Sequence, residues 1–123
     1  MSVAIMRQGD AVIAAIQSDL TDAQVLALRD DLSERVGEHR IRSIIIDVSA
    51  LDVIDSFVAR SLRAMAITGR LRGAETLVVG IRPDVAIAMA HFDLNLAPLH
   101  TATDLDEGLR LLSRLAEEDD GGR

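Results

Sequence analysis

Residues 44–73, IIIDVSALDVIDSFVARSLRAMAITGRLRG, carry the pattern that most restricts the possible folds of this chain. They open with three consecutive isoleucines, a run that is typical of a strand buried on both faces of a parallel sheet. A polar stretch follows, and apolar residues then recur every three or four positions at Val58, Leu62, Met65 and Ala66. That spacing indicates an amphipathic helix. A strand joined to a helix in this way predicts an open α/β sheet, in which functional groups gather at the strand-to-helix loops.

The residues before this stretch predict a hairpin and a helix. Two apolar segments, 3–7 and 11–17, flank a short polar turn that contains glycine, which is a hairpin signal. Thr21 and Gln24, three residues apart, form a capping box at the start of a helix. We expect that helix to end at Gly37.

The alternation continues to the end of the chain and predicts a single α/β domain over residues 1–116. We expect a mixed, mostly parallel sheet of four to five strands, opened by the hairpin, with about four helices packed against it. The residues from Glu117 to Arg123 are expected to form a flexible acidic tail. The remaining elements are expected as strands at 41–47, 76–81 and 99–101, and as helices at 56–72, at 83–91 and after a Thr103 cap.

The composition excludes several classes of protein. All 13 basic residues are arginine, so the chain has no lysine for a Schiff base, a P-loop or general-base chemistry. Its net charge of -7 and the absence of tyrosine and tryptophan argue against a nucleic-acid-binding surface. Cysteine is absent, which excludes disulfides and thiolate chemistry. Because we find no signal peptide and no apolar run near the roughly 20 residues of a membrane span, we expect a cytoplasmic protein with no membrane partner.

Ser56 lies where the polar loop meets the predicted helix, and its hydroxyl admits three roles. A serine at a helix start is most often an N-cap. A nucleophile would need an activating base and an oxyanion hole, and the chain has neither a G-x-S-x-G elbow nor a histidine in a motif-like relation to Ser56. A phosphate would add a charge of about -1.5 to -2, which a helix N-terminus accommodates. That charge would join Asp52 and Asp55 and act as a binding switch.

The stretch IIIDVSALDVIDSFVARSL resembles the signature of STAS domains, the family of bacterial anti-sigma factor antagonists, and within it the RsbS-type scaffolds of the stressosome. The hairpin, the helix order and the length resemble that family along nearly the whole chain, whereas the specific motif covers residues 47–62. The resemblance implies that Ser56 matches the serine phosphorylated by a partner serine kinase of the RsbT type, and that Asp55 matches the acidic residue before it. In the free antagonists of the family, the Asp-Ser pair is followed by a second small hydroxyl residue and then by glycine. Phe57 and Val58 stand here instead, which favours the scaffold type.

On this resemblance we expect a non-enzymatic scaffold that needs no cofactor. It would assemble with STAS-bearing sensor paralogues, by self-association or in a large hetero-assembly, and would sequester the kinase until Ser56 is phosphorylated. The alternative is a free anti-sigma factor antagonist that binds an anti-sigma kinase and is inactivated by phosphorylation of the same serine. The expected partner-binding residues surround the serine: Asp47, Ser49, Asp52, Asp55, Phe57 and Arg60.

The acidic loop admits two other interpretations. Asp47, Asp52 and Asp55 could hold Mg²⁺, although three acids in one loop are more often solvated or capping groups. A response-regulator receiver is also a small α/β domain with acids at strand ends, but it needs a lysine, which this chain lacks.

Arginines and histidines complete the set of candidate residues. Arg60, Arg63, Arg70 and Arg72 form a basic run on the central helix, which is either a solvated face or an interface for acids of a neighbouring subunit. The histidines show no metal-ligand spacing and no carboxylate partner pattern, so we expect them on the surface or in loops. They are His39, His91 and His100.

Overall fold

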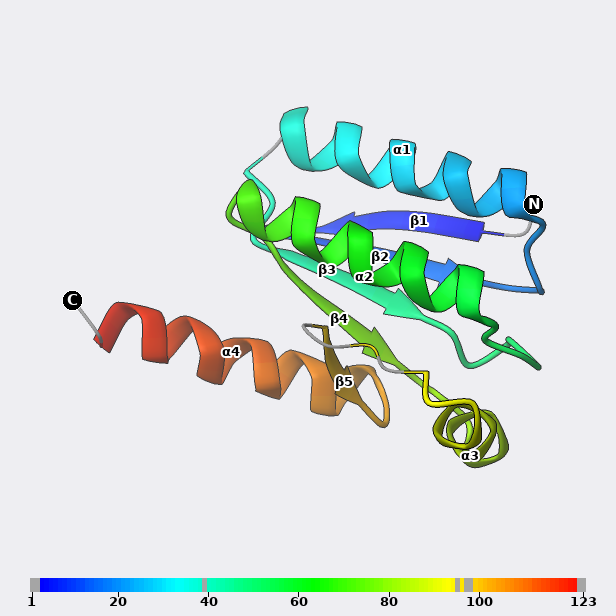
Figure 1. The fold of residues 1–123 in the computed structure, drawn as a ribbon. Helices are drawn as coiled ribbons and strands as arrows, with labels where there is room; N and C mark the ends of the chain where they lie inside the picture. Colours follow the sequence, from blue (N-terminus) through cyan, green and yellow to red (C-terminus); the bar gives the residue numbers. More distant parts are fainter. Residues whose placement is uncertain (1–2, 39, 95, 97–98, 122–123) are drawn as a thin grey trace.

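The computed structural model describes residues 3–38, 40–94, 96 and 99–121, with residues 118–121 described by their backbone alone. Five strands and four helices lie in this part of the chain: β1 (Val3–Gln8), β2 (Ala11–Ile16), α1 (Asp22–Glu38), β3 (Ser43–Asp47), α2 (Ser56–Leu71), β4 (Glu75–Val79), α3 (Pro83–His91), β5 (His100–Ala102) and α4 (Leu105–Gly121). The strands form one sheet in the order β1-β2-β3-β4-β5 (Figure 1). β1 and β2 are antiparallel and the other neighbours are parallel, which confirms the predicted α/β class and its opening hairpin.

The isoleucine run of β3 is buried on both faces of the sheet, as predicted. Ile44 and Ile46 belong to the main core beneath α1 and α2, whereas Ile45 belongs to a smaller core on the opposite face. Ile45 lies beside Ile13 of β2 and Leu77 of β4 in the parallel register. β3 therefore has a strand on each side and packed side chains on both faces, so neither of its ends can shift independently of the core.

The helices divide between the two faces. α1 and α2 run side by side over one face of the sheet, and α4 packs against β3, β4 and β5 on the other (Figure 1). α4 approaches closely because Gly108 faces the sheet, where an added Cβ would lie 2.5 Å from Leu77 Cδ2. α3 lies near the end of β4, at the same edge of the sheet as the start of α2 (Figure 1).

The start of α1 confirms the predicted capping box. The Gln24 N–H donates to Thr21 Oγ1 at 3.2 Å, and the Thr21 N–H donates to Gln24 Oε1 at 2.9 Å. Each side chain thus satisfies one backbone donor that the first helical turn leaves free. The helix ends at Glu38, one residue after the predicted Gly37.

The start of α4 corrects the prediction that Thr103 is its cap. Asp104 is the cap, since its Oδ1 accepts the Glu107 N–H at 2.9 Å, while Glu107 Oε2 accepts the Thr103 N–H at 3.3 Å. A carboxylate suits this place because it also meets the positive end of the helix dipole. α4 continues to Gly121, beyond the end near residue 116 that the sequence pattern predicted. The flexibility of residues 117–123 stays a prediction.

Thr76 of β4 allows a test of the core. Its side chain is buried at 2% exposure, and its hydroxyl oxygen has no hydrogen-bond partner among the described residues. Because an unpaired buried hydroxyl costs about 1–3 kcal/mol, we expect Thr76→Val to raise the free energy of unfolding by about 1 kcal/mol in urea denaturation. Thr76→Ser, which keeps the hydroxyl and loses the methyl group, should lower it. A less stable Thr76→Val protein would contradict this assignment.

Candidate functional site

The loop from β3 to α2, residues 48–55, is anchored by three aliphatic side chains. Val48, Leu51 and Ile54 are 1%, 3% and 5% exposed and belong to the main core. The Val48 N–H donates to the Val79 carbonyl of β4, and the Leu51 N–H donates to the Val48 carbonyl, both at 3.0 Å. The residues between these anchors are exposed. The loop is therefore fixed to the core. The interpretation of this stretch as a polar connection overlooked its aliphatic residues, whose three-residue spacing was a signal of their burial.

Asp47 and Gly80 shape the first turn of this loop. The Asp47 carboxylate accepts the Ser49 N–H at 2.9 Å, which ties it to the loop backbone. Gly80, directly after β4, has a φ of +82° and lies against the turn, where an added Cβ would be 2.9 Å from Ser49 Cβ. Both its conformation and the lack of space therefore require glycine. Its role was not identified from the sequence, although a glycine directly after a strand was a signal.

Asp52 joins the loop to its two neighbours at the carboxyl edge of the sheet. Its N–H donates to Asp19 Oδ1 in the β2–α1 loop at 3.2 Å, and its Oδ1 accepts from Arg82 Nη2 in the β4–α3 loop at 2.9 Å. Asp19 and Arg82 are 33 and 30 residues away from Asp52. No local pattern in the sequence relates residues that far apart, so the fold alone brings them together.

Asp55, and not Ser56, is the N-cap of α2, which corrects the interpretation of the serine as a capping residue. Asp55 has an extended conformation, and its Oδ1 accepts the Val58 N–H at 2.8 Å. Its backbone carbonyl accepts the Ala59 N–H at 2.9 Å. Aspartate and serine are both good N-caps, and the helix itself begins at Ser56, as predicted. Ser56 is thus the first helical residue, and it is exposed.

The neighbours of Ser56 differ in what they expose. Arg60, one turn along α2, is exposed, and its Nε donates to the Ser56 carbonyl at 3.3 Å. Phe57 is half-buried and packs against the main core, so that only part of its ring reaches solvent. Val53, in the loop, is 58% exposed. The surface around the serine therefore combines exposed acidic residues with Arg60 and the exposed aliphatic side chain of Val53.

The three acidic residues proposed for Mg²⁺ do not form a metal site. Asp47, Asp52 and Asp55 bind three separate partners, as described above. In the part of the chain that the structure covers, no group of three or more histidine, aspartate or glutamate side chains lies close enough to hold a metal ion. The magnesium interpretation consequently has no ligand set within that part.

The histidines are placed differently from one another. His91 is exposed at the end of α3, as expected, and His39 lies outside the described residues. His100 begins β5, in the strand expected at 99–101, and its Nε2 lies 3.3 Å from Glu75 Oε2 at the start of β4, a carboxylate contact that no sequence pattern indicated. The parallel pairing of β4 and β5 brings these two residues together.

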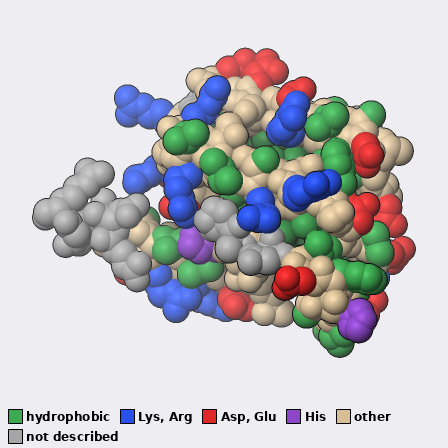
Figure 2. All heavy atoms as spheres, viewed as in Figure 1, with side chains coloured by type: hydrophobic (Ala, Val, Ile, Leu, Met, Phe, Trp, Pro, Cys, Tyr) green, Lys and Arg blue, Asp and Glu red, His purple; other side chains and the backbone are tan. Residues whose placement is uncertain are grey.

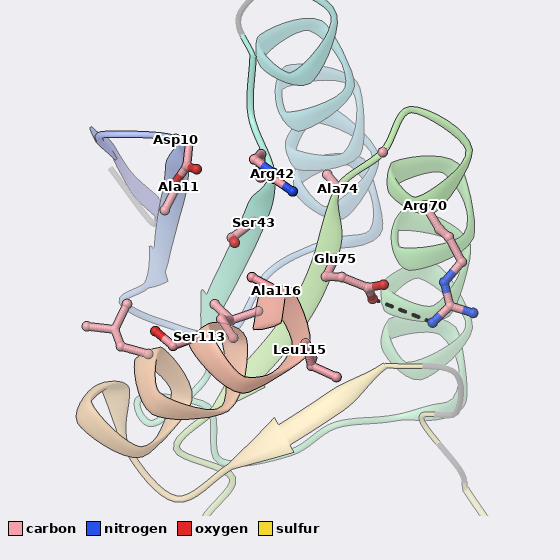
Figure 3. Close-up of a pocket in the computed structure, with 13 residues that line it drawn as sticks. Asp10, Ala11, Arg42, Ser43, Arg70, Ala74, Glu75, Ser113, Leu115 and Ala116 are labelled. Atoms are coloured by element: carbon pink, nitrogen blue, oxygen red, sulfur yellow. Dashed lines mark ion pairs between the residues drawn. The ribbon is translucent and has the colours of Figure 1, made fainter. Parts of the chain in front are cut away.

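A cavity of about 480 Å³ lies at the opposite, amino edge of the sheet. It is bordered by the starts of β2, β3 and β4 and by α4, and an ion pair between Arg70 and Glu75, at 3.5 Å, lies at one side (Figure 3). Arg42 and Ser43 also line it, whereas none of the residues predicted to surround Ser56 does. Beside the serine, a groove of only about 50 Å³ borders Asp55. Such an open helix start suits contact with a macromolecule better than enclosure of a small substrate.

Comparison with known proteins assigns the fold to a family. The family model of the STAS domain matches residues 2–108. The chain belongs to the STAS family. The resemblance to STAS domains inferred from residues 47–62 is thereby confirmed, and the expectation of a non-enzymatic regulator agrees with that family. Among the described residues, no helix is long and apolar enough to cross a bilayer.

Two solved structures resemble this STAS chain over nearly its whole length. RsbS of Moorella thermoacetica, with one serine replaced by glutamate, is 32% identical with a TM-score of 0.80, and the match covers 95% of this chain and 99% of RsbS. A chain from the stressosome, described as a signal integration and transduction hub, is 31% identical with a TM-score of 0.72 over 92% of this chain and 98% of that one.

Curated relatives of the STAS chain include longer proteins. The RsbT co-antagonist protein RsbRA of Bacillus subtilis (strain 168) is 29% identical over 83 residues, which are 68% of this chain and 30% of RsbRA. The co-antagonist RsbRD of the same organism is 22% identical over 110 residues, or 89% of this chain and 40% of RsbRD. The chain thus spans less than half the length of these two relatives.

The capping role of Asp55 can be separated from its charge. Asp55→Ala removes the acceptor for the Val58 N–H, so we expect it to lower the free energy of unfolding by about 1 kcal/mol and to speed hydrogen exchange in the first turn of α2. Asp55→Asn keeps a side-chain acceptor of the same shape and should stay close to the wild type in both measurements. If the two variants lose equal stability, the charge of Asp55 and not its cap stabilises the helix.

Proposed function

We propose that this STAS protein is a stressosome-type scaffold that holds a serine kinase of the RsbT type and releases it when Ser56 is phosphorylated. In this proposal it acts in the cytoplasm, in a large assembly with STAS-bearing sensor paralogues. The observation that carries the proposal is the exposed Ser56 hydroxyl at the first residue of α2, where Asp55 performs the capping. A kinase can therefore modify the serine without removing the helix cap.

The start of α2 has the groups that a phosphate needs. The N–H groups of Ser56 and Phe57 belong to the first turn of α2, whose backbone donors have no acceptor within the helix, and they lie at the positive end of the helix dipole. Arg60 already holds its guanidinium beside the Ser56 carbonyl. A phosphate on Ser56 has both backbone donors and a cation one turn away, so the helix should keep its structure after modification.

The same phosphate would change what a partner meets. Asp52 and Asp55 are exposed on either side of Val53, and a further charge of about -1.5 to -2 makes this surface strongly acidic. We propose that the kinase binds this surface through Asp47, Ser49, Asp52, Asp55, Phe57 and Arg60 while the serine is unmodified. Added charge at the centre of a fitted interface costs desolvation and repels acidic groups, and the kinase leaves.

The rigidity of the loop supports such recognition. Val48, Leu51 and Ile54 hold its backbone in the core, so little conformational freedom is lost when a partner binds. The relatives support the class of partner: RsbRA and RsbRD are named as co-antagonists of RsbT, and RsbS resembles this chain over nearly its full length.

Phosphorylation of Ser56 is the direct test. Incubation of the chain with its cognate RsbT-type kinase and ATP should add one phosphate, and tandem mass spectrometry of the digested protein should place it on Ser56. The Ser56→Ala protein should stay unmodified under the same conditions. A phosphate on another residue with none on Ser56 would contradict the proposed switch.

Charge at Ser56 should control retention of the kinase. We expect Ser56→Ala to bind the kinase as the unmodified protein does, and Ser56→Asp to bind it at least about tenfold more weakly in a titration, since a tenfold change is only about 1.4 kcal/mol. Ser113→Asp adds the same charge at an exposed position of α4 and should leave binding unchanged. Equal binding by the two Ser56 variants would exclude control by charge.

A further inference from the structure

α2 carries apolar side chains on two opposite sides. Its inner side, with Leu62, Met65 and Ala66, is buried against the sheet. On its outer side Ala64, Ile67 and Leu71 follow one another at spacings of three and four, which places them in one line along the helix. All three are exposed, Ile67 at 51% and Leu71 at 84%. A single exposed leucine is ordinary, but an exposed row at helical spacing marks a contact surface.

Arginines flank this outer α2 row, by which we mean Ala64, Ile67 and Leu71. If Ala64 and Leu71 are assigned to heptad position a and Ile67 to position d, Arg63 and Arg70 both fall on position g. Both arginines are exposed. Figure 2 shows basic side chains alternating with hydrophobic ones over α2. In a chain with a net charge of -7, this is a local basic surface on an acidic protein.

Arg72, the last member of the basic run, does not belong to this surface in the same way. Arg72 is directed toward α1, where its Nη1 donates to the Ser33 carbonyl at 3.3 Å. α1 packs along the flank of α2 that carries Thr68 and Arg72, and the Arg63 and Arg70 flank lies away from it. The ion pair between Arg70 and Glu75 is 3.5 Å long and partly exposed, so it holds Arg70 only weakly. Nothing in the described part of the chain covers the outer α2 row.

We propose that the outer α2 row docks an acidic amphipathic helix of a partner protein. The partner helix packs along α2 with its aliphatic side chains between Ala64, Ile67 and Leu71, and places glutamate or aspartate opposite Arg63 and Arg70. The row lies in the second half of α2, whereas Ser56 begins the helix. A partner can therefore dock here whether or not the serine is phosphorylated, and the inference goes beyond the kinase switch.

The arrangement of charges favours an acidic partner helix over two other occupants, a second copy of the chain and an anionic membrane. Two copies paired through α2 in antiparallel orientation would place Arg63 and Arg70 opposite the same arginines, and that repulsion disfavours a symmetric dimer. An anionic membrane would attract the arginines, but only Ile67 and Leu71 are large enough to insert, and the net charge of -7 opposes approach.

A labelled synthetic peptide of about four heptads tests the proposal, with leucine at positions a and d and glutamate at e and g. The glutamates keep the peptide from pairing with itself. In fluorescence anisotropy we expect the wild-type chain to bind this peptide at least tenfold more tightly than a matched peptide with lysine at e and g. Leu71→Asp should weaken binding at least tenfold. Ile87→Asp on α3, at a side chain 71% exposed, should leave binding unchanged.

A variant with reversed charges on α2 distinguishes a change of binding preference from a loss of folding, and the measurement requires no kinase. The double variant Arg63→Glu with Arg70→Glu should prefer the lysine peptide over the glutamate peptide, and circular dichroism should show an unchanged fold. Equal binding of both peptides to the wild type, unaltered binding by Leu71→Asp, or unaltered preference after charge reversal would overturn the proposal. Two further outcomes would also overturn it: capture of phosphatidylglycerol vesicles in place of the peptide, or a dimer of the chain alone that Leu71→Asp dissolves.

Discussion

The burial of β3 on both faces of the sheet determines where Ser56 lies. Ile44 and Ile46 pack into one core and Ile45 into the other, so the strand can neither slide nor rotate without exposing large aliphatic side chains. Its carboxyl end is therefore fixed. Val48, Leu51 and Ile54 extend this anchoring through the loop to the start of α2. The serine is exposed on a support that belongs to the core, and a partner would meet a preformed surface.

In the proposed function, Asp55 and Ser56 divide two tasks, the capping of α2 and its regulation. Asp55 closes the first turn of α2 through its carboxylate and its carbonyl, and the Ser56 hydroxyl is not needed for the helix. A side chain that contributes little to stability can change its charge at small cost to the fold. In physical terms this separates the proposed regulatory residue from the structural one, and it explains why the two Asp55 variants and the Ser56 variants should affect different measurements.

Local patterns in the sequence predicted what depends on neighbouring residues. The isoleucine run, the capping box of Thr21 and Gln24 and the helical spacing after Ser56 each follow from contacts within a few positions. The caps of α2 and α4 were each misplaced by one residue because aspartate, serine and threonine are all good caps. Two contacts join residues that are distant in the sequence. Asp52 and Arg82 are 30 positions apart, and Glu75 and His100 are 25 positions apart. Only the parallel sheet brings the members of each pair together. The phosphorylation switch rests on family resemblance and not on spacing.

In the proposed function, this STAS protein holds a kinase inside a large assembly until Ser56 carries a phosphate. Sedimentation velocity of the chain co-expressed with STAS-bearing paralogues and the RsbT-type kinase tests it most directly. We predict that kinase and chain sediment together as a large particle, that ATP moves the kinase to the slow fraction, and that Ser56→Ala keeps it in the particle. A chain that stays in small complexes with an anti-sigma kinase, or a kinase that leaves the Ser56→Ala particle on addition of ATP, would contradict it.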